Sequence, residues 1–127
     1  MYAKHLFDYA VIRVVPRVER EEFINVGVIL FCKAEKFLNV KYFLDKNRLL
    51  ALSSELDIHT VDENIKAIEE ICMGSKAGGA IGELDIASRF RWLTATRSTV
   101  IQASKVHPGY TANALETLEK LYSELVL

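Results

Sequence analysis

The sequence predicts an α+β fold, built as a two-layer sandwich in which an antiparallel meander and a later strand form one sheet and helices pack on one face. Three runs rich in β-branched and aromatic residues occupy the first 44 positions. From there on, apolar residues recur at helical spacing. A length of 127 residues fits a single domain over positions 1–127, with a core that needs neither disulfides nor a structural metal.

The early runs predict strands at residues 6–15, 25–32 and 37–44. Pro16 ends the first strand, because proline has no backbone N–H to donate to a sheet. Gly27 interrupts the second strand, and this predicts a β-bulge or a close approach of another backbone.

Two helices are predicted after the meander. The first is short and covers residues 44–52. The second is capped by Thr60, because Glu63 follows it at capping-box spacing, and it ends at Gly74. The glycine-rich stretch 75–82 predicts a mobile loop.

The rest of the chain predicts a weak helix at residues 83–93, a strand at 98–104 and a C-terminal helix. Thr111 is placed to cap that last helix. Its apolar face is formed by Leu115, Leu118, Tyr122 and Leu125.

The net charge of −1 conceals a segregation of charges. Acidic residues cluster near positions 19–22, 55–70 and 116–124, whereas residues 86–115 contain none. A nearly neutral chain is a poor general binder of nucleic acid, although a local cationic patch can hold one phosphate group. No apolar run reaches the roughly 18–20 residues that span a bilayer, so we expect a cytoplasmic protein with no membrane association.

Cofactor and metal chemistry find little support in the sequence. Cys32 and Cys72 each lie in an apolar run without a paired spacing, and this predicts buried free thiols. His5 and His59 have no partner at metal-ligand spacing. No phosphate-binding loop, dinucleotide fingerprint or nucleophile elbow is present, so we expect no metal and no cofactor.

The stretch 89–107 carries the least ordinary chemistry. Its arginines, Arg89, Arg91 and Arg97, offer planar forks of donors that match a phosphate or a carboxylate. The alternative is that they are surface residues balanced by acids elsewhere in the fold. Neutral hydrogen bonds around the same ligand would come from Ser98, Thr99 and Gln102.

Two further residues of this stretch have competing interpretations. Trp92 can stack on a base or a guanidinium, but a lone tryptophan in a small protein more often belongs to the core. His107 precedes Pro108-Gly109, which predicts a turn in which its ring reaches solvent. A catalytic histidine also needs a nucleophile or an orienting acid, and the sequence places neither beside it.

A second group of charges lies in the segment 17–23, which is either a long hairpin connection or a helical turn. If Arg20 and Glu22 point the same way, they can pair with Arg97 and join the two regions. A segment that carries both positive and negative side chains suits a structural salt-bridge network as well as a ligand site. The candidates here are Arg13, Arg17, Arg20 and Glu22.

The stretches FDYAVIRVVPRVEREEFINVGVIL (7–30) and RFRWLTATRSTVIQASKVHPG (89–109) resemble those of a widespread bacterial family known only as a domain of unknown function. Thr96 and Lys105 stand where members of that family often have proline. The resemblance also implies a partner, since genes of this family often neighbour one for a HipA-like kinase. Matching positions include Arg13, Pro16, Arg17, Glu19, Arg20, Glu22, Asn25, Gly27, Arg89, Trp92, Leu93, Arg97, Ser98, Thr99 and Gln102.

Together these features favour a non-enzymatic binding or regulatory module that acts with a protein partner, for which the resemblance suggests a HipA-like kinase. The alternative is a small enzyme or binding protein for a phosphate-bearing or nucleic-acid ligand, which uses the arginine-rich stretch 89–107 with Glu19, Glu22 or His107 as acid-base groups. A homodimer is compatible with either hypothesis.

Overall fold

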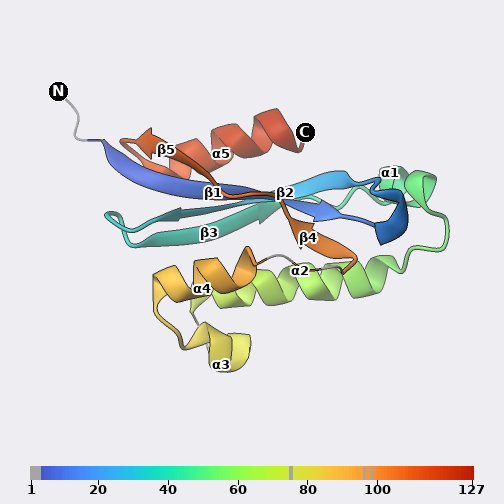
Figure 1. The fold of residues 1–127 in the computed structure, drawn as a ribbon, viewed down its shortest axis with the longest axis horizontal. Coiled ribbons are helices and arrows are strands. Elements are labelled where there is room, and N and C mark those ends of the chain that lie inside the picture. Colours follow the sequence, from blue (N-terminus) through green and yellow to red (C-terminus); the bar gives the residue numbers. More distant parts are fainter. Residues whose placement is uncertain (1–3, 75, 96, 98) are drawn as a thin grey trace.

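The computed structural model describes residues 4–74, 76–95, 97 and 99–127 (Figure 1). A five-stranded antiparallel sheet forms its centre, in the order β3-β2-β1-β4, and β5 also pairs with β1. The predicted meander and later strand are confirmed, and β5 is an addition. The strands are β1 (His5–Val14), β2 (Ile24–Cys32), β3 (Phe37–Tyr42), β4 (Ile101–Ala103) and β5 (His107–Thr111).

Helices cover both faces of this sheet, so the expectation of helices on one face needs correction (Figure 1). The helix α5 packs on one face, and α1, α2 and α4 contribute to the core on the other. The helices are α1 (Lys46–Leu52), α2 (Ile58–Met73), α3 (Gly79–Gly82), α4 (Ile86–Leu93) and α5 (Ala114–Leu125), with 3₁₀ turns η1 (Val18–Arg20) and η2 (Lys76–Gly78).

The central strand explains the two helical layers. Along β1, Ala10, Ile12 and Val14 are buried in the core beneath α2 and α4. Phe7 alternates with them and is buried in the second core beneath α5. A strand that is apolar on both faces requires cover on both. The prediction missed this because it assigned the helices to one side only.

A β-bulge lies where β1 and β2 approach their connection. Ile12 pairs with Gly27, but the next pair is Arg13 with Asn25, so Val26 is the extra residue on β2. A Cβ on Gly27 would come within 3.0 Å of the Lys41 carbonyl oxygen. Both interpretations of this glycine, a bulge and a close backbone approach, are therefore confirmed.

The strands β4 and β5 lie end to end along the same edge of β1, with an irregularity at Ser104. Ile12 pairs with Ala103 and Tyr9 pairs with His107, which leaves one residue more on the edge side than on β1. At this point Ser104 Oγ accepts the Val11 N–H at 2.8 Å, and the Ser104 N–H donates to the Val11 carbonyl at 2.8 Å. The serine hydroxyl thus replaces a carbonyl in the ladder.

The strand β5 was predicted as a turn, because Pro108-Gly109 is a strong turn signal. An edge strand tolerates proline, since the missing N–H faces outward. A Cβ on Gly109 would lie 2.6 Å from Cζ of Phe7, so only glycine fits against that ring. The packing of Phe7 explains the glycine, which the local pattern alone assigned to a turn.

The helix starts differ from the prediction. The N-cap of α2 is Asp57, whose carboxylate accepts the N–H and the hydroxyl of Thr60, so Thr60 is not the cap. The N-cap of α5 is Asn113, whereas the Thr111 hydroxyl is buried and accepts the Asn113 N–H. The described part of the stretch 75–82 forms η2 and α3 where a loop was expected.

Replacement of Ser104 by alanine tests the edge irregularity. The change removes the acceptor of the buried Val11 N–H, so the free energy of unfolding should fall by about 1–3 kcal/mol in urea denaturation. Ser123→Ala, at an exposed position of α5, is the control and should change it by less than about 0.5 kcal/mol. Equal effects of the two substitutions would contradict this role of Ser104.

Candidate functional site

The two charged regions of the sequence meet at a cavity of about 460 Å³ at the end of the sheet. The first region contributes Arg13 from β1, and the second contributes Arg97 and Gln102 from the segment around β4. The remaining lining residues are Val15, Val18, Glu21 and Phe23. We call this cavity the Arg13–Arg97 pocket.

A row of polar side chains crosses the sheet beside this pocket. Arg13 pairs with Asn25 on one side and with Gln102 on the other, so the three residues lie next to one another across β2, β1 and β4. Asn25 Nδ2 donates to the Leu125 carbonyl at the end of α5, which places the row on the α5 side of the sheet.

Two atoms of this row are buried without a hydrogen-bond partner in the protein, namely Arg13 Nε and Asn25 Oδ1. The first is a donor and the second is an acceptor, because the Asn25 amide nitrogen is committed to Leu125. An unpaired buried polar group costs about 1–3 kcal/mol. Among the residues that the structure describes, these are the two buried side-chain atoms without a partner, and they belong to residues that are paired in the sheet.

Both arginines of the pocket are held against aromatic rings. The Arg13 guanidinium carbon lies 4.2 Å from the centroid of Phe23, and that of Arg97 lies 4.3 Å from the centroid of Trp92. Arg97 Nη2 also donates to the Trp92 carbonyl. Stacking orients a planar guanidinium while its N–H edge stays available for an anion.

The pocket has a small positive excess. Its charged lining consists of two arginines and Glu21. Glu21 has a left-handed backbone conformation with φ of 57°, which residues other than glycine adopt rarely. The Gln102 amide is positioned by donating to the Thr99 carbonyl at 2.9 Å, and it retains a second N–H. N–H groups of the two arginines and of Gln102 can therefore donate hydrogen bonds to an anionic oxygen in the pocket.

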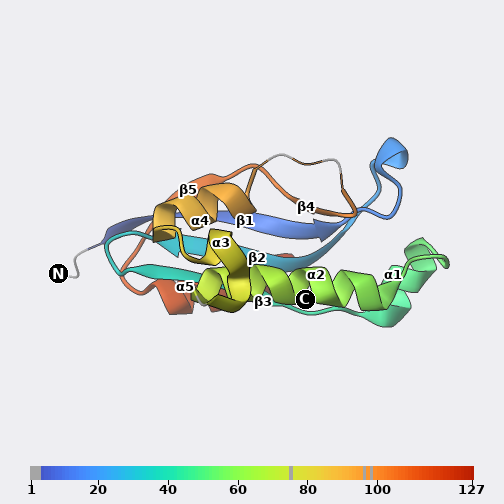
Figure 2. The ribbon, with the colours of Figure 1, turned by 90° about the horizontal axis from the view of Figure 1, so that it is seen from below.

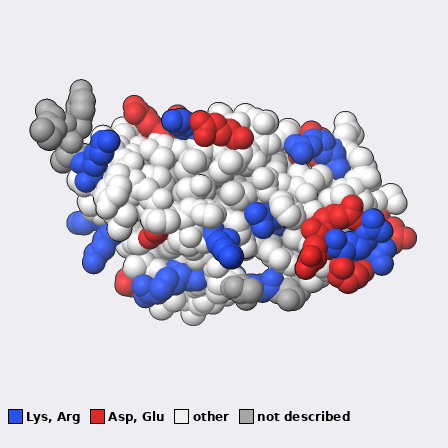
Figure 3. All heavy atoms as spheres, turned by 45° about the horizontal axis from the view of Figure 1, so that its top comes forward, with Lys and Arg blue, Asp and Glu red and all other residues white. Residues whose placement is uncertain are grey.

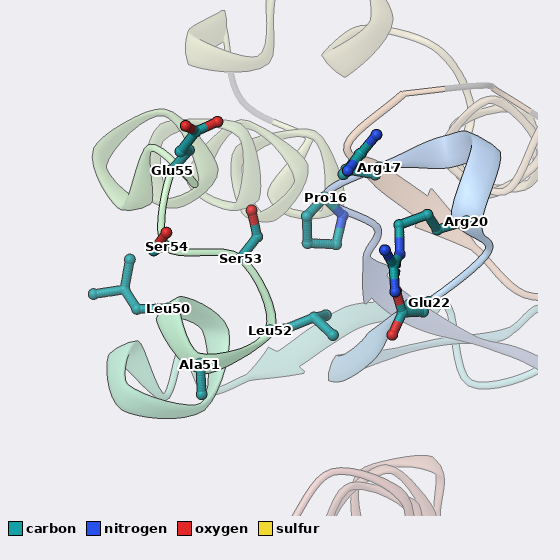
Figure 4. A pocket seen from close by; sticks show the side chains of 10 residues that line it. All are labelled: Pro16, Arg17, Arg20, Glu22, Leu50, Ala51, Leu52, Ser53, Ser54 and Glu55. Atoms are coloured by element: carbon teal, nitrogen blue, oxygen red, sulfur yellow. Dashed lines mark hydrogen bonds and ion pairs between the residues drawn. The ribbon is translucent and has the colours of Figure 1, made fainter.

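Three other candidates, Arg17, Arg20 and Glu22, line a different cavity of about 400 Å³ (Figure 4). There the side chains of Arg20 and Glu22 lie against each other, and the 50–55 segment forms the opposite wall. The segment 17–23 is a hairpin connection that contains the helical turn η1, so both of its interpretations hold. Arg20 and Glu22 pair with each other, and Glu22 does not form the expected ion pair with Arg97.

The charges of this second cavity are largely neutralised within the connection itself. Arg17 Nε bonds Glu19 Oε1 at 2.8 Å, and Arg20 Nε bonds Glu22 Oε1. Hydrogen bonds from its own backbone and then from Arg17 lower the pKa of the Glu19 carboxyl. Figure 3 shows acidic and basic side chains interleaved at this end of the molecule, while much of the neighbouring α5 side is uncharged. These are two exposed ion pairs within the connection, and neither of them links it to Arg97.

Arg89 has a structural environment of its own. Its Nη1 donates to the Ile71 and Cys72 carbonyls at 2.8 Å, and its Nε donates to the Leu84 carbonyl at 3.0 Å. These carbonyls include the last turn of α2, where a cation complements the helix dipole. Arg89 thus caps α2 and does not line the Arg13–Arg97 pocket.

Among the described residues, three further candidates do not line the Arg13–Arg97 pocket, namely His107, Thr99 and Trp92. His107 is on β5, where its ring lies 5.3 Å from that of Tyr9, and it does not line the Arg13–Arg97 pocket. The Thr99 hydroxyl donates to the Ile101 carbonyl at 2.6 Å. Ser98 is outside the described residues. Trp92 is 42% exposed, so the expectation of a core tryptophan is wrong.

Other groups provide no second reactive centre among the described residues. Cys32 and Cys72 are free and buried, as predicted, and burial raises the pKa of the Cys72 thiol to about 12. Within the described parts of the chain, no cluster of three or more metal-ligating side chains occurs. In those same parts, none of the helices combines the length and apolar character needed to cross a membrane.

The sequence analysis did not identify Phe23 and Glu21 as pocket residues and did not place Asn25 beside Arg13. The available signal was Gly27, because the bulge that it marks changes which β2 residue stands opposite Arg13. A bulge re-aims side chains next to functional sites in many sheets. Applied to this strand, that rule would have brought Asn25 beside Arg13.

The fold and the pocket define an α+β protein with stacked arginines in a cavity at the end of an open antiparallel sheet. The chain belongs to the family described as Protein of unknown function (DUF3037), whose family model matches residues 9–126. This confirms the resemblance of residues 7–30 and 89–109 to a family known only as a domain of unknown function. No curated protein and no solved structure matches the chain.

The contrasting roles of the arginines can be tested by stability measurements. Arg89→Ala removes the donors to the α2 carbonyls and should lower the free energy of unfolding by about 1.5–3 kcal/mol, as expected for hydrogen bonds to a charged group. Arg91 on the same helix is exposed and bonds Ser88 Oγ. Arg91→Ala should therefore change stability by less than about 0.5 kcal/mol. If denaturant unfolding gives similar values for both variants, Arg89 does not cap α2.

Proposed function

We propose that this protein is a binding module that acts through a protein partner, and that the Arg13–Arg97 pocket receives an acidic group of that partner. The observation that carries the proposal is the convergence of two ring-stacked guanidinium groups on one cavity, beside the orphaned Nε of Arg13. A carboxylate placed there would accept charge-assisted hydrogen bonds from donors that are already oriented.

A partner that offers peptide groups suits the orphaned pair better than a bare anion does. Arg13 Nε needs an acceptor, and Asn25 Oδ1 needs a donor. A peptide unit supplies both, in its carbonyl and its N–H, whereas a fully ionised phosphate supplies acceptors alone. The Phe23 ring that stacks on the Arg13 guanidinium is 45% exposed, so a partner can reach this part of the pocket.

Binding has more support than catalysis. In the enzymatic alternative, Glu19, Glu22 or His107 works beside the arginines as an acid or base. None of the three lines the Arg13–Arg97 pocket, and Glu19 and Glu22 are each paired with an arginine of their own connection. Glu21 does line it, and a carboxylate at the rim suits discrimination between partners as well as proton transfer.

Anion binding is measured most directly by thermal unfolding in sulfate and in acetate. A ligand that binds only the folded state at 100 times its dissociation constant adds about 2.7 kcal/mol. For a chain of this size the midpoint should rise by about 10 °C. Arg97→Gln and Arg13→Met should each lose most of that rise, because each removes one guanidinium and keeps much of the side-chain volume.

Arg91→Gln is the matched control for this experiment, since Arg91 is exposed and does not line the pocket. It also corrects for the general stabilisation that sulfate gives by exclusion from protein surfaces. If all four proteins show the same rise, the pocket has no specific affinity for anions and the proposal fails.

The HipA-like kinase implied by the family resemblance is the first protein partner to test. When the kinase is co-expressed with this chain, the two should co-elute from a size-exclusion column. Arg97→Glu should abolish co-elution, because a like charge would face the partner's acidic group. Arg91→Glu should leave it intact. Absence of co-elution with the wild-type chain would exclude this kinase as the partner without affecting the anion measurements.

A further inference from the structure

A third cavity lies on the other side of Arg97, between α2 and residues 99–101. Its volume is about 520 Å³, and the side chains that line it are mainly apolar. The apolar members are Leu56, Val61, Ala67, Ile68, Ile71, Trp92, Val100 and Ile101. We call this cavity the α2 groove.

The groove has α2 and the residues before it as one wall, and Trp92, Arg97 and residues 99–101 as the other. Figure 2 shows α2 along one side of the sheet and β4 along the other, with α4 over one end only. Strands β1 and β2 are visible between α2 and β4 beyond the end of α4 (Figure 2). Trp92 and Val100 are 42% and 37% exposed at the groove, so apolar surface remains there that an occupant would bury.

Arg97 joins the groove to the Arg13–Arg97 pocket, because it lines both cavities. Its guanidinium stacks on Trp92, which is itself a wall of the groove. The anion-binding group and the apolar surface are therefore in contact with each other. A ligand held by Arg97 would place whatever is attached to its acidic group at the entrance of the groove.

The two ends of the groove carry charges of opposite sign, Arg97 at one end and Asp57 at the other. Arg97 shares a small adjoining cavity with Ile68 and Trp92, which places it toward the C-terminal half of α2. Asp57 lies at the N-terminal end of α2, and the hydrogen bond from the Thr60 hydroxyl lowers the pKa of its carboxyl. Asp57 thus stays ionised near neutral pH and disfavours a second acidic group at its end.

The length of the groove fits a short peptide segment. From Asp57 to Ile71 the lining residues span about 20 Å along α2 at the usual helical rise. Six extended residues reach about the same distance. The volume is more than three times that of an apolar cavity of about 150 Å³ that binds benzene, so it accommodates more than one large side chain.

We propose that the α2 groove binds large apolar side chains of the partner segment whose acidic residue occupies the Arg13–Arg97 pocket. The proposal rests on the function proposed above and names the recognised motif: an acidic residue beside large apolar residues, with no further acid at the Asp57 end. Arg97 binds the acidic group, and the walls of the groove bind the apolar side chains next to that group in the partner segment.

The probes are acetate, hexanoate and hexanol, at concentrations below those at which they associate. Trp92 is the single tryptophan of the chain and lines the groove, so its fluorescence reports occupancy. Hexanoate should bind at least about tenfold more tightly than acetate, because partial burial of its additional methylene groups is favourable. Hexanol, which has no charge for Arg97, should bind more weakly than hexanoate.

Ala67→Glu places a charge in the groove at an exposed position of α2. It should abolish the advantage of hexanoate over acetate. Ala80→Glu, at an exposed position of α3 that does not line the groove, is the matched control and should retain it. Equal binding of acetate and hexanoate, or equal losses in the two variants, would overturn the proposal.

Failure of the proposed function gives a different pattern. If hexanol and hexanoate bind equally and Arg97→Gln affects neither, the groove is an apolar site unconnected to an anion, and the linked motif is wrong. If sulfate and acetate still stabilise the wild type through Arg13 and Arg97 but hexanoate has no advantage, the anion pocket stands alone. The two results separate the groove from the pocket.

Discussion

The hydrogen bonding of β1 on both of its edges is the interaction on which the rest of the structure depends. The strand pairs with β2 along one edge and with β4 and β5 along the other, and its side chains enter both cores. Arg13 lies on this strand and is half-buried. Arg13 is therefore held on a strand that is paired along both edges, which suits a group that must keep one orientation.

Much of the architecture was predictable from local patterns. The β-branched and aromatic runs gave the meander, and helical spacing gave α2, α4 and α5, because each signal lies within one element. Features that depend on distant partners were not predictable in this way. The strand β5 exists because Pro108-Gly109 lies along β1 and against Phe7, and the α5 layer exists because β1 is apolar on both faces.

The candidate site was predicted in part, and the reason is similar. Arg13, Arg97 and Gln102 were singled out by residue type, and the structure brings them to one cavity. Arg89 has the same chemistry but is committed to the carbonyls of α2, and the arginines of the 17–23 connection are paired locally. Sequence identifies which side chains can bind an anion, whereas the tertiary contacts decide which of them have donors to spare.

The irregularity at Ser104 has a consequence for how this protein behaves in a crowded solution. A long regular edge strand is a template on which another chain can polymerise into a larger sheet. Here the outer edge is divided between two short strands, carries Pro108, and has the Ile101 carbonyl occupied by the Thr99 hydroxyl. Such an edge offers no continuous row of free donors and acceptors, so another chain cannot readily extend the sheet on the β4 and β5 side; the opposite edge is formed by β3.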